Sequence, residues 1–120
     1  TITSKGNIID PFMVWKDGLY YLWYKPQEGG FNVEYASSNS FYGPYAPVKV
    51  GDWAGWGTFM EAPCVVKFPD RWRVYFDAYQ NSFDQGQLQY SDSFDDWQTW
   101  TPRQSTVTPV QAKHGTIIRS

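Results

Sequence analysis

Two carboxylates stand at matching places in two similar stretches of this sequence. Asp10 lies within Ile8-Ile-Asp-Pro-Phe12, and Glu61 lies within Met60-Glu-Ala-Pro63. Two carboxylates that face one pocket suit the hydrolysis of a glycosidic bond, because one protonates the leaving oxygen while the other activates water or attacks. Either residue alone fits an ordinary acidic turn residue before a proline. The functional interpretation therefore rests on the repeated pair.

The two stretches belong to an internal repeat with a period near fifty residues. Pro11–Val14 aligns with Pro63–Val66 at an offset of 52, and Ser38–Phe41 aligns with Ser91–Phe94 at an offset of 53. Gly115–Arg119 has the pattern of the first strand of a further copy. A period of this length with about four short strands per unit is typical of a β-propeller blade.

The elements of each unit are predicted to be strands. Helix signals are nearly absent, and aromatic and β-branched residues form short runs between Gly, Pro, Asp and Asn. We therefore predict an all-β fold, a partial β-propeller with two four-stranded blades and the first strand of a third. Within this single domain the units are expected to span about residues 7–52, 58–106 and 112–120.

A propeller also predicts where the residues that carry chemistry meet. The first strand of each blade lies nearest the central axis, so the starts of successive first strands converge at one end of the channel. Asp10 and Glu61 are therefore expected to lie close together although 51 residues separate them. His114, the only histidine, stands at the matching place in the third unit. It is a candidate metal ligand, substrate donor or pKa modulator, and the alternative is a surface residue.

Aromatic residues are abundant, with seven Trp, nine Tyr and eight Phe, and most are expected to fill the space between blades. Trp53 and Trp56 lie in the glycine-rich loop Gly51–Gly57 that leads to the second carboxylate. We predict that both are exposed and that at least one contacts a sugar ring. Asp77 ends the second apolar run of unit two, where we predict a substrate contact, and its counterpart in unit one is Lys25.

The composition excludes several classes of partner and site. Ten Lys and Arg against twelve Asp and Glu give a net charge of −2, so we predict no nucleic-acid partner held by phosphate neutralisation. No apolar run approaches the ~20 residues that a membrane span needs, so we predict no membrane partner. The single cysteine, Cys64, excludes an intramolecular disulfide, and neither a Cys cluster nor a His cluster offers a zinc site.

Three motifs in order give the chain a resemblance to glycoside hydrolase family 43. Ile9–Pro11 followed by Asp17–Leu22 resembles the second blade of that family. Glu61–Pro63 followed by Trp72–Asp77 resembles its third blade, and His114-Gly115 resembles the start of its fourth. The resemblance spans almost the whole chain.

This resemblance implies a fold, an activity and roles for single residues. The family consists of five-bladed propellers, inverting enzymes that remove arabinofuranosyl or xylosyl units from plant polysaccharides. It implies an oligo- or polysaccharide partner, no required cofactor, and a secreted or periplasmic location. Glu61 then becomes the general acid, and Asp10 becomes the carboxylate that tunes and orients it. His114 becomes the central histidine that in many members holds a cation, calcium or sodium, or its waters on the propeller axis.

The sequence departs from the family pattern in two places. The family usually has Glu-Gly-Pro where this chain has Glu61-Ala62-Pro63, a mild change where the backbone does not need a positive φ. The family's first blade, which supplies the general base, has no counterpart before Asp10. Loss of a general base costs about 10²–10⁴-fold in rate, and we do not assign that role to Asp77.

Three interpretations of function remain open at this point. The first is a family 43-like glycoside hydrolase that acts on arabinose- or xylose-containing glycans and lacks part of its site. The second is a non-catalytic carbohydrate-binding module, which keeps the aromatic residues and needs no base. The third is an assembly protein, because open sheet edges favour association. Copies of the chain would then complete the propeller as a homo-oligomer and supply the missing carboxylate.

Overall fold

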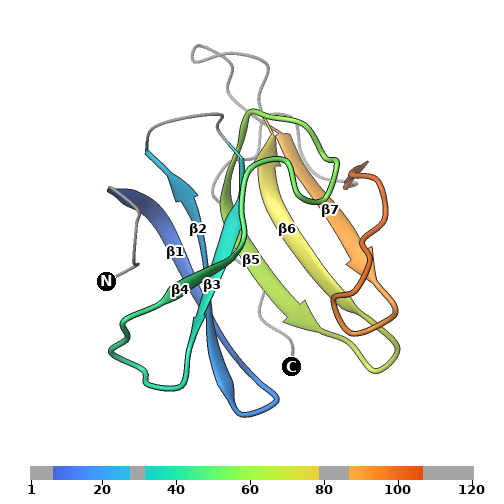
Figure 1. Cartoon of the computed structure of the whole chain (residues 1–120). Coiled ribbons are helices and arrows are strands. Elements are labelled where there is room, and N and C mark those ends of the chain that lie inside the picture. Colours follow the sequence, from blue (N-terminus) through green and yellow to red (C-terminus); the bar gives the residue numbers. More distant parts are fainter. Residues whose placement is uncertain (1–6, 28–31, 79–86, 107–120) are drawn as a thin grey trace.

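The computed structural model describes residues 7–27, 32–78 and 87–106. The apolar runs of the sequence form strands that alternate with short turns (Figure 1). In chain order they are β1 (Ile8–Lys16), β2 (Leu19–Pro26), β3 (Glu34–Ser38), β4 (Ala46–Lys49), β5 (Met60–Lys67), β6 (Trp72–Ala78), β7 (Gln87–Ser93) and β8 (Gln104–Ser105).

The strands form two four-stranded antiparallel sheets in sequential order, β1-β2-β3-β4 and β5-β6-β7-β8. The prediction of an all-β fold with two four-stranded units is thereby confirmed for the part of the chain that the structure describes. The predicted first strand of a third unit, at 112–120, lies outside the described residues. Within the described ranges no helix has the length and apolar character to cross a membrane.

The turn between β1 and β2 follows directly from its sequence. Lys16 pairs with Leu19, which leaves Asp17 and Gly18 as a two-residue loop, and both have positive φ angles of 53° and 82°. Asp-Gly favours this conformation because Gly has no Cβ and Asp tolerates the left-handed region. The loop therefore sets the register of the first hairpin.

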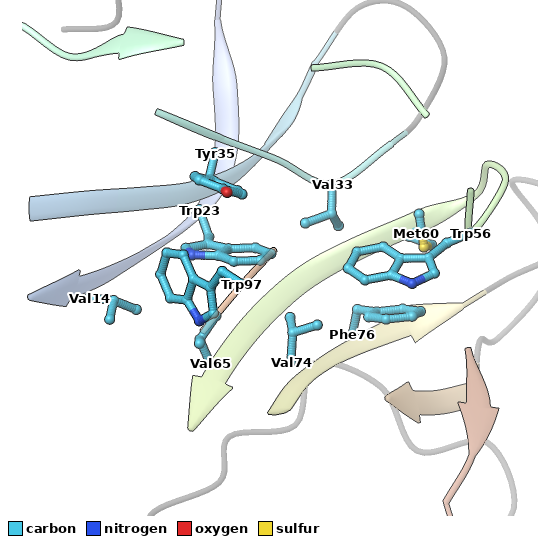
Figure 2. Close-up of a cluster of buried hydrophobic side chains, with 10 residues drawn as sticks. All are labelled: Val14, Trp23, Val33, Tyr35, Trp56, Met60, Val65, Val74, Phe76 and Trp97. Atoms are coloured by element: carbon cyan, nitrogen blue, oxygen red, sulfur yellow. The ribbon is translucent and has the colours of Figure 1, made fainter. Parts of the chain in front are cut away.

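The two sheets pack face to face, with β5 beside β1 and β2 (Figure 1). Alternate residues of each strand point into the space between the sheets. Trp23 from the first sheet and Val74 and Phe76 from the second belong to one buried cluster in this space, and none of these three side chains is exposed (Figure 2). Tyr24 and Tyr45 belong to a smaller buried cluster on the opposite face of the first sheet.

Indole rings dominate the space between the sheets. Trp23 stacks on Tyr35 at 4.7 Å between ring centroids, and it meets the edges or faces of Trp53, Trp97 and Trp100 at 5.4–5.9 Å. Such pairs add about 0.5–1.5 kcal/mol each beyond their area burial. The buried indole nitrogens of Trp23, Trp97 and Trp100 have no conventional acceptor. Edge-to-face packing offers an N–H group a ring face as a weak acceptor.

A lysine links the two sheets at the β1–β2 end. The Lys16 ammonium lies 3.1 Å from the Asp96 carboxylate and 4.9 Å from the centre of the Trp97 ring. Asp96 and Trp97 belong to the β7–β8 connection, so one cation contacts a charge and a ring of the other sheet. This contact fixes the connection against the first hairpin.

Candidate functional site

The inner strands of the two sheets carry matching β-bulges. In β1, Asp10 and Pro11 interrupt the regular pairing with β2, and in β5, Ala62 and Pro63 interrupt the pairing with β6. Asp10 and Ala62 have nearly equal positive φ angles, 53° and 55°. A bulge accommodates proline because the inserted residue leaves the hydrogen-bond ladder. The proline of each repeat therefore marks the same backbone feature.

This register corrects the sequence alignment of the two carboxylates by one residue. Asp10 corresponds in the structure to Ala62, while Glu61 corresponds to Ile9. The proline repeat has an offset of 52, whereas the carboxylates stand 51 residues apart. Because each bulge has the same shape, the backbone follows the prolines rather than the acidic residues.

The structure nevertheless brings Asp10 to Glu61. The Asp10 carboxylate oxygen Oδ2 accepts a hydrogen bond of 3.1 Å from the backbone N–H of Ala62. This N–H belongs to the peptide bond that joins Glu61 to Ala62, so the Asp10 side chain contacts the backbone of its expected partner. Both carboxylate residues are half-buried, which leaves them partly open to solvent.

Asp77 lies directly beside Glu61. The two residues are register partners on β6 and β5, and such cross-strand neighbours have Cβ atoms about 4.5–5.5 Å apart. Asp77 is fully buried, so its carboxylate has no surface for a substrate in this arrangement. A direct substrate contact of Asp77 stays a prediction. Lys25 occupies the same register position in the first sheet, opposite Ile9, and it is buried as well.

The prediction that Trp56 is exposed is wrong. Its side chain is 5 % exposed, it stacks on Phe76 at 5.3 Å, and its indole N–H donates to the carbonyl oxygen of Thr101 at 3.1 Å. Figure 2 shows the ring lying over Phe76 between the sheets. The ring therefore has no free face for a sugar.

The loop Gly51–Gly57 turns inward because residues just before and at the start of β3 hold it. Asn32 donates a hydrogen bond of 2.7 Å to the carbonyl of Gly57, and Glu34 accepts one of 2.6 Å from the N–H of Gly51. Neither residue was among the predicted site residues. A carboxylate between Val33 and Tyr35 was the available signal, because a charge in an apolar strand needs a partner.

Trp53, in the same loop, is half-buried rather than fully exposed. Its indole N–H donates to the carbonyl of Val33 at 2.8 Å, which fixes the orientation of the ring. Part of the ring still lines a hollow at the surface. A ligand contact for Trp53 therefore stays a prediction.

Comparisons with known proteins identify the architecture of these two sheets. No protein-family model matches the sequence, and no curated protein sequence matches it. Several solved structures do. The catalytic domain of a glycoside hydrolase family 62 α-L-arabinofuranosidase from Coprinopsis cinerea has 24 % identity and a TM-score of 0.65, and the match covers 85 % of this chain and 32 % of that one.

Two further solved structures give the same result. A thermostable family-43 glycoside hydrolase has 15 % identity and a TM-score of 0.62, with 86 % of this chain and 35 % of that chain covered. An exo-1,5-α-L-arabinanase from a bovine ruminal metagenomic library has 19 % identity and a TM-score of 0.62, with 87 % and 37 % covered. The chain is a partial β-propeller. It spans about a third of the length of these structures.

Each sheet is therefore one blade, and β1 and β5 are the inner strands of neighbouring blades. The fold resemblance to family 43 that the sequence motifs predicted is confirmed at this level. The Asp10–Glu61 pair lies where β1 and β5 begin, at the axial end of both blades.

The predicted axial role of His114 falls outside the described residues, as does a calcium or sodium ion beside it. Within the described ranges no group of three or more His, Cys, Asp or Glu side chains could hold a metal ion. Cys64 is buried on β5, as expected for an inert small apolar residue.

Three substitutions at Asp10 separate its two structural contributions. Asp10→Asn keeps an oxygen acceptor and tolerates a positive φ, so we expect little change in the free energy of unfolding. Asp10→Gly relieves the strain of the positive φ angle but loses the hydrogen bond from the Ala62 N–H. A hydrogen bond to a charged group contributes about 1.5–3 kcal/mol to stability. Asp10→Ala also adds the cost of a left-handed residue, about 1–2 kcal/mol. The loss in free energy of unfolding should increase from Asn to Gly to Ala, and urea unfolding measures it. An equal loss for all three variants would contradict this order.

The backbone at the Ala62 bulge is strained, and a substitution that relieves this strain should measurably stabilise the fold. Ala62 has a φ of 55°, in a region where an L-residue costs about 1–2 kcal/mol and glycine does not. The sequence departure from Glu-Gly-Pro therefore falls where glycine is favoured. We expect Ala62→Gly to raise the free energy of unfolding by about 1 kcal/mol, since part of the gain is offset by glycine's entropy in the unfolded chain. Ala46→Gly on exposed β4 is the control and should lower it.

Proposed function

We propose that this chain carries the general acid, but not the general base, of a glycoside hydrolase site that acts on arabinose- or xylose-containing glycans. The observation that carries the proposal is the 3.1 Å hydrogen bond from the Ala62 N–H to Asp10, which links the Asp10 carboxylate of one blade to the peptide bond that follows Glu61 in the neighbouring blade. The similar solved structures include an α-L-arabinofuranosidase and an arabinanase, which supports arabinose-containing glycans as the substrate class.

In this proposal Glu61 is the general acid. It gives its proton to the glycosidic oxygen as the bond between that oxygen and the anomeric carbon breaks. Asp10 is the positioning carboxylate, because its hydrogen bond holds the peptide of Glu61 at the bulge. Asp77 lies beside Glu61 on the same face of the blade, as its register partner on β6.

An inverting reaction also needs a base that takes a proton from the attacking water on the opposite face of the sugar. We assign this role to none of the described residues. We propose that further blades supply it, either in a longer protein or in a second copy of the chain that completes the ring. This acid/base reaction requires no cofactor.

The test is sugar release from aryl arabinofuranosides, aryl xylosides and the corresponding oligosaccharides, with and without sodium azide. Azide attacks the anomeric carbon directly and needs no base, so a chain with the acid alone should form the glycosyl azide. Pentose release without azide would show that the base is present, and light scattering would show whether a second copy supplies it. Sugar binding with neither product would contradict the hydrolase proposal and favour a non-catalytic carbohydrate-binding module.

A further inference from the structure

The hollow beside Trp53 lies at the outer edge between the two blades, and neither Asp10 nor Glu61 lines it. Its volume is about 240 Å³. Its lining residues are Lys49, Trp53, Ala54, Trp97, Gln98, Thr99 and Trp100. Lys49 ends β4, the outermost strand of the first blade, and residues 97–100 belong to the connection between β7 and β8. No lining residue lies on the inner strands, so this outer hollow is separate from the proposed catalytic pair.

Two half-buried indole rings form a corner in the outer hollow. Trp53 and Trp100 lie 6.4 Å apart between ring centroids at an angle of 82°. Trp53 is held by its hydrogen bond to the Val33 carbonyl. Trp100 packs against Trp23 and Trp56 at 5.6 and 6.0 Å. Both rings are therefore fixed before any ligand arrives, which lowers the entropic cost of binding.

Polar groups stand around this aromatic corner. The side chains of Lys49, Gln98 and Thr99 are exposed and offer an ammonium, an amide and a hydroxyl group. The connection that carries two of them is well fixed, because Asp95 accepts hydrogen bonds from the backbone N–H and the hydroxyl of Thr99 at 2.9 and 2.5 Å. The rim therefore presents polar groups at set positions beside flat apolar walls.

We propose that the outer hollow is a second carbohydrate-binding site, which takes one sugar ring at a chain end or branch of the glycan. A sugar ring has an apolar face of C–H groups that packs on an indole and a rim of hydroxyls that pairs with amide and hydroxyl groups. The volume is below the roughly 300–1,000 Å³ of pockets for drug-sized ligands, so it suits a single ring. The glycan class rests on the proposed function; the site itself does not.

The test follows indole N–H signals of the isotope-labelled 120-residue chain during titration with methyl α-L-arabinofuranoside, methyl β-D-xyloside, arabinobiose and xylobiose. Saturable shifts of the Trp53 and Trp100 signals are expected. Gln98→Ala should raise the dissociation constant about fivefold, because one neutral hydrogen bond is lost, and Trp100→Leu should abolish the shifts. Tyr42→Ala, which removes an aromatic ring that is 86 % exposed elsewhere, is the matched control and should change nothing.

The outcomes separate this proposal from the hydrolase proposal. Glu61→Gln should leave the Trp53 and Trp100 shifts unchanged, because Glu61 does not line the outer hollow. No saturable shift with any of the four sugars would overturn the second site, whatever the hydrolysis assay shows. A dissociation constant for Gln98→Ala within twofold of that of the unaltered chain would also overturn it. If Trp100→Leu does not fold, Gln98→Ala still tests the second site, because Gln98 is exposed and its replacement should not disturb the fold.

Discussion

Replacing Glu61 with glutamine is expected to slow glycosyl azide formation from arabino- and xylo-oligosaccharides in the presence of azide by about 10²–10⁴-fold. Glutamine has nearly the same shape but no proton to give to the leaving oxygen. The sugar alkoxide that leaves is then a poor leaving group. Initial rates of glycosyl azide formation measure the loss, and the midpoint of thermal unfolding should stay close to that of the unaltered chain because the Glu61 side chain is half-buried.

The leaving group distinguishes a general acid from a merely structural residue. A dinitrophenolate leaves without protonation, so Glu61→Gln should slow the dinitrophenyl arabinofuranoside far less than the oligosaccharide. The basic limb of the pH–rate profile should also disappear, since that limb reports loss of the acid's proton. An equal loss of rate on both substrates would contradict the general-acid role of Glu61.

Replacing Trp23 with alanine is expected to remove a large share of the free energy of unfolding. The Trp23 side chain has no exposed surface, stacks on Tyr35, and contacts indoles from both blades. Truncation of a buried aromatic side chain costs about 3–5 kcal/mol, against total stabilities of about 5–15 kcal/mol. Urea unfolding followed by circular dichroism measures the change.

Trp15 provides the matched control for this core substitution. It is the same residue type on the adjacent strand, it is 59 % exposed, and its ring packs against the ring of Tyr20. Trp15→Ala should cost less than about 1 kcal/mol. Equal losses for the two variants would show that the indole cluster does not hold the blades together.

Much of the fold could be read from local patterns. Alternating apolar residues predict the strands, Asp17-Gly18 predicts the first hairpin turn, and the repeat of Pro11–Val14 in Pro63–Val66 predicts that the two units are alike. These features depend on residues that are neighbours in the chain, and the structure confirms them.

The candidate site was only partly accessible to the same reasoning. The repeat brought Asp10 and Glu61 to one end of the fold, but their alignment was one residue off. The bulges decide the register, and a bulge depends on how the inner strand pairs with β2 or β6. The strained φ of Ala62 follows from that pairing and carries no separate sequence signal.

The loop Gly51–Gly57 also shows the difference between what the sequence predicts and what the tertiary structure decides. A glycine-rich loop with two tryptophans predicts an exposed platform, yet Trp56 is buried and Trp53 is half-buried. Their positions depend on contacts with Asn32–Glu34 and Thr101, which are distant in the chain. Exposure is a property of these contacts, so loop composition does not determine it.

The sequence by itself determined the all-β class, the two repeated four-stranded units and the pair of residues at the axial end. Each of these follows from periodicity and repetition, which are local and additive. The tertiary structure alone decided which backbone positions carry the bulges, that Asp10 binds the amide after Glu61, and which indoles retain surface. The bulges depend on strand pairing within each blade. The Asp10 contact and the exposure of the indoles depend on packing between the two blades, where one side chain contacts residues up to 80 positions away, as Lys16 does with Asp96.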